Sequence, residues 1–292
     1  MNEFKAYHPI VNFAYFVCII CFSVLLMHPA CLFVSLFSSL SYLAVLKGKK
    51  ALFTNLLYML PLAFATALIN AAFNHEGATI LAYLPGGNPL TLESVVYGFC
   101  AAVMIFSVIC WFSCYNEVMT SDKFIYLFGR VSPALALVFS MTLRFVPRFA
   151  EKLSEVTIAR RSLGKGAGNR NVRERIKSGL SSLSATLTWA LENSIETADS
   201  MKARGYGIPG RTSFSIYSFE KKDKIALALI FALSICVIYG RICGVLNFSY
   251  FPTFGAIRSD FAAVSSVFAY FLLCIVPIVI ELKGMGRWKK SK

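Results

Sequence analysis

The sequence predicts an all-α, polytopic membrane helix bundle of about five to seven apolar helices, with a long amphipathic helical domain on the cytoplasmic side. The first observation is composition: 57% of the 292 residues are hydrophobic and 15% are charged, whereas soluble domains carry about a quarter charged residues. The second is that the hydrophobic residues form long continuous runs. The third is that residues 144–224 hold 16 of the 29 Lys and Arg and 8 of the 15 Asp and Glu.

The apolar runs are predicted to be helices, because a segment in hydrocarbon must satisfy its own backbone hydrogen bonds. They cover residues 10–27, 29–46, 51–73, 94–114, 131–147, 225–241 and 261–280. Several reach the 18 or so residues that a spanning helix needs. The run 131–147 is the weakest candidate, since it is short and ends near Arg144 and Arg148.

The distribution of Lys and Arg predicts the orientation, because cytoplasmic loops are enriched in both. The basic link 47–50, residues 142–224 and the tail from Lys283 are assigned to the cytoplasm, and the loops 74–93 and 242–260 to the outside. With both ends inside, an odd number of runs cannot all span. Either 131–147 is re-entrant or the N-terminus lies outside, and the sequence leaves both open.

This orientation predicts three domains. They are an N-terminal transmembrane domain (1–143), a cytoplasmic helical domain (144–222) and a C-terminal pair of transmembrane helices with a basic tail (223–292). We read the net charge of +14 as the bias of cytoplasmic loops and expect no nucleic-acid partner.

No catalytic residue and no metal ligand is assigned. The cysteines lie in or beside apolar runs, where Cys behaves as a small hydrophobe. The Cys18-x-x-Cys21 pair lies within the first run and lacks further ligands nearby. No Gly-Lys-Ser/Thr sequence occurs, so no nucleotide loop and no cofactor is expected in this chain.

Two amphipathic helices are predicted in the basic segment. The first, residues 144–163, carries apolar side chains every three to four positions and ends at Gly164. The second covers residues 172–204. Its apolar face includes Leu180, Leu183, Leu187, Leu191 and Ile195. Such stripes need covering: they can pack on each other, lie at the membrane interface or receive a partner.

Both helices carry Ala-Arg near their ends, as Ala159-Arg160-Arg161 and as Ala203-Arg204-Gly205. A cation at a helix C-terminus is stabilised by the helix dipole, so simple capping is one interpretation. Because two such ends occur in one basic segment, a docking role is as good an interpretation as capping.

Three motifs together resemble one family. They are Leu143-Arg144-Phe145-Val146-Pro147, then Ala159-Arg160, then Lys202-Ala203-Arg204-Gly205-Tyr206-Gly207. The pattern, with the apolar first half and two closing spans, resembles the T component (EcfT/CbiQ-like) of energy-coupling factor (ECF) ABC transporters. The last motif is the more specific one. In the first, Arg161 stands where the family has Gly.

The resemblance implies a non-catalytic coupling subunit of an importer for a vitamin or transition-metal ion in the bacterial plasma membrane. It implies that two cytoplasmic ABC ATPases, which bind ATP and Mg²⁺, dock on the Arg-bearing helix ends. The docking residues would be Ala159, Arg160, Arg161, Ala203, Arg204 and Gly205. It also implies a membrane-embedded S component that binds the substrate and responds to the two helices.

Two other classes of function were weighed. A membrane-embedded lipid-modifying enzyme would use clustered acids or His; Glu192, Glu196 and Asp199 share one helix but are better explained as a solvated or partner-facing stripe. An autonomous secondary transporter would show repeats or intramembrane charges, and the apolar runs show neither.

Overall fold

The computed structural model describes the chain apart from residues 1–2, 84–88, 165–171, 209–216, 257–259 and 291–292. The chain divides into two compact units. We call Met1–Thr120 together with Tyr217–Lys292 the membrane unit, and Ser121–Ile216 the helical unit. Residues 165–171, between the two predicted amphipathic helices, and residues 209–216, after the motif Lys202–Gly207, therefore lie outside the described part of the chain.

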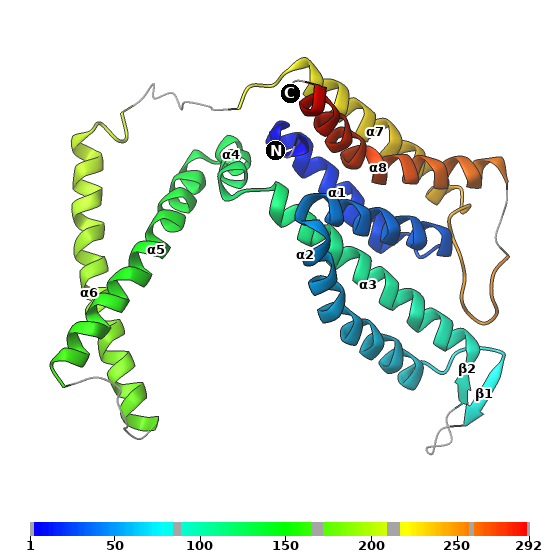
Figure 1. The fold of residues 1–292 in the computed structure, drawn as a ribbon, viewed down its shortest axis with the longest axis horizontal. Helices are drawn as coiled ribbons and strands as arrows, with labels where there is room; N and C mark the ends of the chain where they lie inside the picture. The colour runs from blue at the N-terminus through cyan, green and yellow to red at the C-terminus, as the bar shows by residue number, and fades with distance from the viewer. Residues whose placement is uncertain (1–2, 84–88, 165–171, 209–216, 257–259, 291–292) are drawn as a thin grey trace. The chain divides into compact units, whose positions relative to one another are not determined.

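The membrane unit is built from long helices that lie side by side, with a β-hairpin at one end of α3 (Figure 1). Its elements are η1 (Phe4–Ala6), α1 (Pro9–Leu25), α2 (Pro29–Phe73), β1 (Ile80–Tyr83), β2 (Pro89–Thr91), α3 (Leu92–Val118), α7 (Lys221–Ile242) and α8 (Phe261–Lys290). The predicted helical membrane bundle is confirmed.

Four helices in the described part of the chain are long and apolar enough to cross a membrane. They are Pro29–Gly48, Leu92–Val118, Lys221–Ile242 and Phe261–Gly284. The helices Pro9–Leu25 and Leu60–Asn70 are apolar but shorter. Gly48, with a φ of 77°, breaks α2 within the predicted basic link 47–50.

A chain of hydroxyl groups runs through the buried core of the membrane unit. Ser35 on α2 is hydrogen-bonded to Ser23 Oγ at 2.9 Å and to Ser107 Oγ at 2.5 Å, and it accepts from Trp111 Nε1 at 3.1 Å. Ser23 Oγ also lies 3.0 Å from the Tyr270 hydroxyl on α8. Because a polar group in hydrocarbon is costly without a partner, this network fixes how α1, α2, α3 and α8 meet.

The β-hairpin was not predicted, since residues 74–93 were expected to be a loop. Strands β1 and β2 pair antiparallel. The Glu93 carboxylate at the start of α3 accepts from the Thr79 hydroxyl at 2.7 Å. Strands of four and three residues are too short to show a two-residue hydrophobic period, which is why no strand was predicted there.

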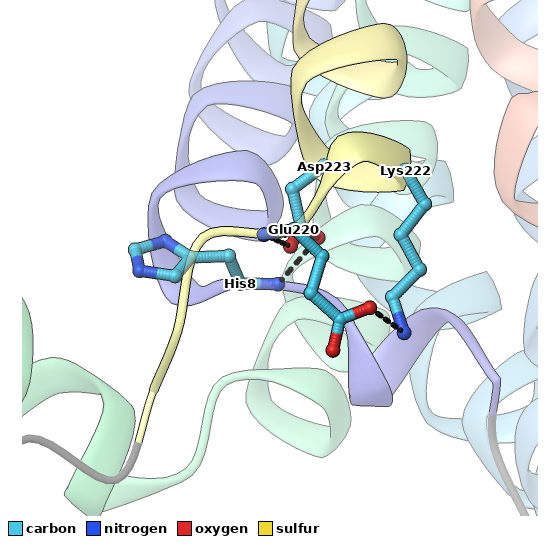
Figure 2. A network of polar contacts seen from close by, with 4 residues as sticks. All are labelled: His8, Glu220, Lys222 and Asp223. Carbon is cyan, nitrogen blue, oxygen red and sulfur yellow. Dashed lines mark hydrogen bonds and ion pairs between the residues drawn. The ribbon is translucent and has the colours of Figure 1, made fainter.

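The beginning of α7 is joined to the beginning of α1 through one buried carboxylate (Figure 2). Asp223 accepts from the backbone N–H of His8 at 3.1 Å and from that of Glu220 at 3.0 Å. Glu220 in turn pairs with Lys222 Nζ at 3.1 Å. The His8 ring packs against Phe219 at 4.8 Å. These contacts fix the entry of the chain into α7 against α1.

The helical unit contains α4 (Ser121–Val131), α5 (Pro133–Ser162) and α6 (Val172–Ala203). Figure 1 shows α5 and α6 crossing each other. Helix α4 packs on α5 through aromatic rings, with Phe128 6.1 Å from Phe139. The two predicted amphipathic helices are therefore present, and α4 is an element that the sequence analysis did not separate.

Helix α5 is longer than predicted at its N-terminal end. It runs without a break from Pro133 through Pro147 to Ser162, so the run 131–147 and the first basic helix form one element. That run is not among the helices that meet the criteria for spanning. The packing boundary at Ser121 reflects the α4–α5 contact, whereas the predicted domain boundaries rest on membrane sidedness and stay predictions.

Candidate docking surfaces of the helical unit

Helix α6 has two opposite faces of different character. Small polar side chains at Ser182 and Thr186 are buried, with 4% and 3% of their surface exposed. The predicted apolar face points the other way, because residues two apart differ by about 200° around an α-helix. Its side chains are between 48% and 67% exposed: Leu180, Leu183, Leu187, Leu191 and Ile195. We call these five residues the leucine face.

The buried face of α6 lies against α5. The Phe149 ring of α5 meets the Trp189 ring of α6 edge to face, with centroids 6.0 Å apart. Lys152 Nζ lies 5.7 Å from the centre of the Trp189 ring, at a distance typical of a cation–π contact. Helix α6 therefore covers part of the apolar stripe of α5 at Phe149. Of the leucine face, Leu183 lines a cavity between the two helices, and the other four side chains are left without a partner in the described part of the chain.

The C-terminal end of α6 is a Schellman motif, formed by residues of the sequence motif Lys202-Ala203-Arg204-Gly205-Tyr206-Gly207. The N–H of Tyr206 donates to the Met201 carbonyl at 3.0 Å, and that of Gly205 donates to the Lys202 carbonyl at 2.9 Å. Gly205 has a φ of 79°, a conformation that favours glycine. Arg204 is the residue immediately before this turn and is exposed. The motif thus ends the helix and presents one cation at its end.

The C-terminal end of α5 is arranged differently. The left-handed glycine is Gly164, with a φ of 69°, and its N–H donates to the Arg161 carbonyl at 3.0 Å. Arg160 therefore lies inside the last turn and not at the cap. Its Nη1 donates to Ser181 Oγ on α6 at 2.5 Å, while its Nε is buried and has no acceptor among the described residues. Arg161 is exposed.

A small cationic cavity of about 190 Å³ lies where α5 and α6 meet. Arg160 and Arg161 from α5 and Arg175 from α6 line it. Its described lining contains no Asp or Glu. Guanidinium groups bind carboxylates strongly, so this cavity suits an acidic side chain supplied from outside.

The structure thus gives the predicted docking residues two distinct settings. Ala203, Arg204 and Gly205 lie at one helix end, whereas Arg160 and Arg161 line a cavity and Ala159 is exposed beside them. Ser181 and Arg175 were missed. The small polar residues four apart at Ser178, Ser182 and Thr186 were the available signal, since they mark a second helix–helix contact face.

The acids considered in the sequence analysis do not gather into a site. Glu192, Glu196 and Asp199 are all exposed, and Asp199 lies 3.9 Å from Lys202 Nζ. In the described part of the chain, no three His, Cys, Asp or Glu side chains are placed so that they could hold a metal ion.

Comparison with known proteins places this arrangement in a family. The CbiQ family, described as cobalt transport protein, matches residues 6–214. The chain belongs to the CbiQ family. The match covers α1 to α3 of the membrane unit and the two Arg-bearing helices of this CbiQ-family chain, and it ends before α7 and α8. The resemblance to ECF T components is confirmed at that level.

Curated relatives carry the same assignment. The chain is similar to the energy-coupling factor transporter transmembrane protein EcfT of Staphylococcus aureus, 30% identical over 112 residues. It is 33% identical to EcfT of Lactobacillus helveticus over 100 residues. These alignments span 38% and 34% of this chain and 42% and 36% of the relatives, so they cover about two fifths of the relatives' length.

Proposed function

We propose that this chain is the transmembrane coupling subunit of an ECF-type importer in the bacterial plasma membrane. Its proposed role is to transmit the motion of two cytoplasmic ABC ATPases to an S component that binds a vitamin or a transition-metal ion. ATP and Mg²⁺ would be bound by the ATPases, and the chain itself would be non-catalytic. The helical unit and the C-terminus would face the cytoplasm.

One observation carries this proposal: α6 is a single continuous helix that joins an exposed cation at its end to an unpartnered apolar face along its length. A rigid helix transmits a displacement at its end to its whole length. Force applied at Arg204 would therefore move the leucine face as one body.

The helix ends are the proposed ATPase contacts. Arg204 precedes a turn that Gly205 fixes, so little backbone freedom is lost when a partner binds it. At the other end, the cavity of Arg160, Arg161 and Arg175 would take an acidic side chain. Removing one partner of a buried charge pair typically costs about 2–5 kcal/mol.

The leucine face is the proposed contact for the S component. Five large side chains about half exposed or more, in one stripe, form the type of apolar patch that marks a protein or membrane contact. An amphipathic helix that lays such a stripe into an apolar surface is a recurring mode of recognition. The absence of charge among these five side chains suits a membrane-embedded partner.

The proposal is tested by co-purification of the two ATPases with tagged variants of this chain. We expect Arg204→Glu to weaken retention of the ATPases by roughly thirty-fold or more, corresponding to the loss of about 2 kcal/mol or more. The double variant Arg160→Glu/Arg204→Glu should retain none.

Arg173→Glu is the matched control, because Arg173 is exposed at the opposite end of α6 and the charge change is the same. It should retain the ATPases. Unchanged co-purification with the double variant would contradict the proposal, as would ATP hydrolysis by the purified chain alone.

A further inference from the structure

A groove of about 770 Å³ lies between α7 and α8 in the membrane unit. Its walls are aliphatic: Ile225, Ala226, Leu229, Leu233, Leu272, Ile275, Val276, Val279 and Ile280. Two cations, Lys222 and Lys283, and one acidic residue, Glu3, lie among the residues that line one end. Both helices belong to the candidate membrane spans, so lipid and not water faces most of the groove.

The groove has the length of one leaflet. It begins at Lys222 on α7 and reaches Leu233, a rise of about 16 Å at 1.5 Å per residue. On α8 it runs the opposite way, from Lys283 to Leu272. Half of a bilayer's hydrocarbon core is about 15 Å thick. The groove therefore runs from headgroup level to the middle of the bilayer.

The charged end is built by the N-terminal segment. The buried Glu281 carboxylate accepts from the backbone N–H of Glu3 at 2.9 Å and from that of Phe4 at 3.2 Å, which holds η1 against α8. A side chain at Gly284 would overlap Glu3, so this close approach requires glycine. Glu3, Ala6 and Tyr7 thereby form one wall of the mouth.

The two lysines differ in their surroundings. Lys222 pairs with Glu220 (Figure 2). Its Nζ also lies 6.0 Å from the centre of the Tyr7 ring, and both contacts hold the ammonium at the mouth. Lys283 has no ion-pair partner among the described residues and is exposed. Lys221 and Lys224 add two further exposed cations at the start of α7.

We propose that this groove binds a phospholipid with an anionic headgroup, with one acyl chain between α7 and α8 and the phosphate at Lys222 and Lys283. An aliphatic groove of one-leaflet depth fits an acyl chain. Cations at its outer end select an anionic headgroup over a zwitterionic one, at a gain of affinity for each lysine near the headgroup. The site is independent of the docking surfaces on the helical unit.

In the test, phosphatidylglycerol or phosphatidylcholine is added to the detergent-purified full chain. Bound lipid is measured by native mass spectrometry, and the midpoint of thermal unfolding is measured separately. Phosphatidylglycerol should bind and raise the midpoint more than phosphatidylcholine does. Lys222→Gln/Lys283→Gln should lose about tenfold or more in affinity for phosphatidylglycerol and abolish the difference between the two lipids. The matched control Lys221→Gln/Lys224→Gln removes the same charge outside the groove and should keep the difference.

A second variant tests the acyl-chain part. Leu229→Trp fills the groove from a half-exposed position, so it should reduce binding of either lipid at this site while the lipid-free midpoint stays near that of the unchanged protein. The proposal would be overturned if the two lipids bound equally and raised the midpoint equally. It would also be overturned if the two double variants lost the same affinity for phosphatidylglycerol. Full lipid binding by Leu229→Trp with loss of a membrane-protein partner would assign the groove to that partner and would also overturn it.

Discussion

The two Arg-bearing helices look alike in sequence but are used differently in the fold. Helix α5 packs Phe149 and Lys152 against α6, and its Arg160 side chain donates a hydrogen bond to Ser181 of α6. Helix α6 places small polar residues and Trp189 against α5 and leaves most of its leucine face exposed. Helix α5 thus acts as a support, and α6 is the element that offers both an apolar face and a cation at its end.

The position of one glycine explains the difference between the two ends. In the motif that ends α6, Gly205 directly follows Arg204. The backbone adopts the left-handed conformation at Gly205, and the helix ends there. In the first motif Arg161 occupies that place and the turn is deferred to Gly164. A non-glycine residue in the left-handed conformation costs roughly 1–2 kcal/mol, so α5 continues past Arg160.

The largest effect is expected on the leucine face. Leu187→Asp puts a charge at the middle of the stripe and should release the S component, with a loss of about 2 kcal/mol or more, while the ATPases stay bound. Ala185→Asp is the control, because Ala185 is exposed on the far side of α6 from Leu187. Co-purification of S component and ATPases measures both. Retention of the S component by Leu187→Asp would remove the functional distinction between α5 and α6.

A smaller effect is expected from the two glycines. Gly205→Ala and Gly164→Ala each place a side chain at a positive φ and should each lower stability by about 1 kcal/mol. Only Gly205→Ala should also reduce ATPase retention, since it redirects Arg204. Thermal unfolding and co-purification separate the two effects, and equal losses of retention would mean that both ends dock in the same way.

The smallest effect is expected at Ser181. Ser181→Ala removes the hydrogen bond to Arg160 and should cost about 1 kcal/mol of stability. ATPase retention should fall by less than threefold, and Ser181→Thr should restore it. A loss as large as that of Arg204→Glu would show that the α5 end depends on a fixed Arg160 guanidinium.

Local signals in the sequence predicted much of this architecture. The 3.6-residue periodicity located α6, and the glycine after Arg204 located its end. The basic link around Gly48 marked the break in α2. These features depend on residues close together along the chain, where the backbone preferences of glycine and the alternation of apolar and polar positions decide the structure.

Features that depend on distant contacts were not predictable in the same way. The hydrogen bond between Arg160 and Ser181 requires the crossing of α5 and α6, and the face of α6 that packs carries serine and threonine and not leucine. The hairpin next to Glu93 and the mouth of the α7–α8 groove depend on hydrogen bonds between residues that are not close along the chain. Periodicity shows which residues share a face, but not which face a neighbour covers.

If α6 transmits motion from its Arg204 end to its leucine face as one rigid body, a break in the helix between the two should stop transport. Ala198→Pro breaks the helix between Ile195 and Arg204, since an interior proline costs about 3 kcal/mol and kinks an α-helix. Ala198→Ser is the control, because it leaves the helix intact.

The decisive measurement is ATP-driven uptake of the S component's substrate into proteoliposomes that contain the assembled complex. We expect Ala198→Pro to retain both ATPases and the S component but to lose uptake by at least about tenfold, a barrier increase of roughly 1.4 kcal/mol or more. Uptake by Ala198→Pro at the level of Ala198→Ser, with all partners bound, would contradict rigid-body transmission by α6.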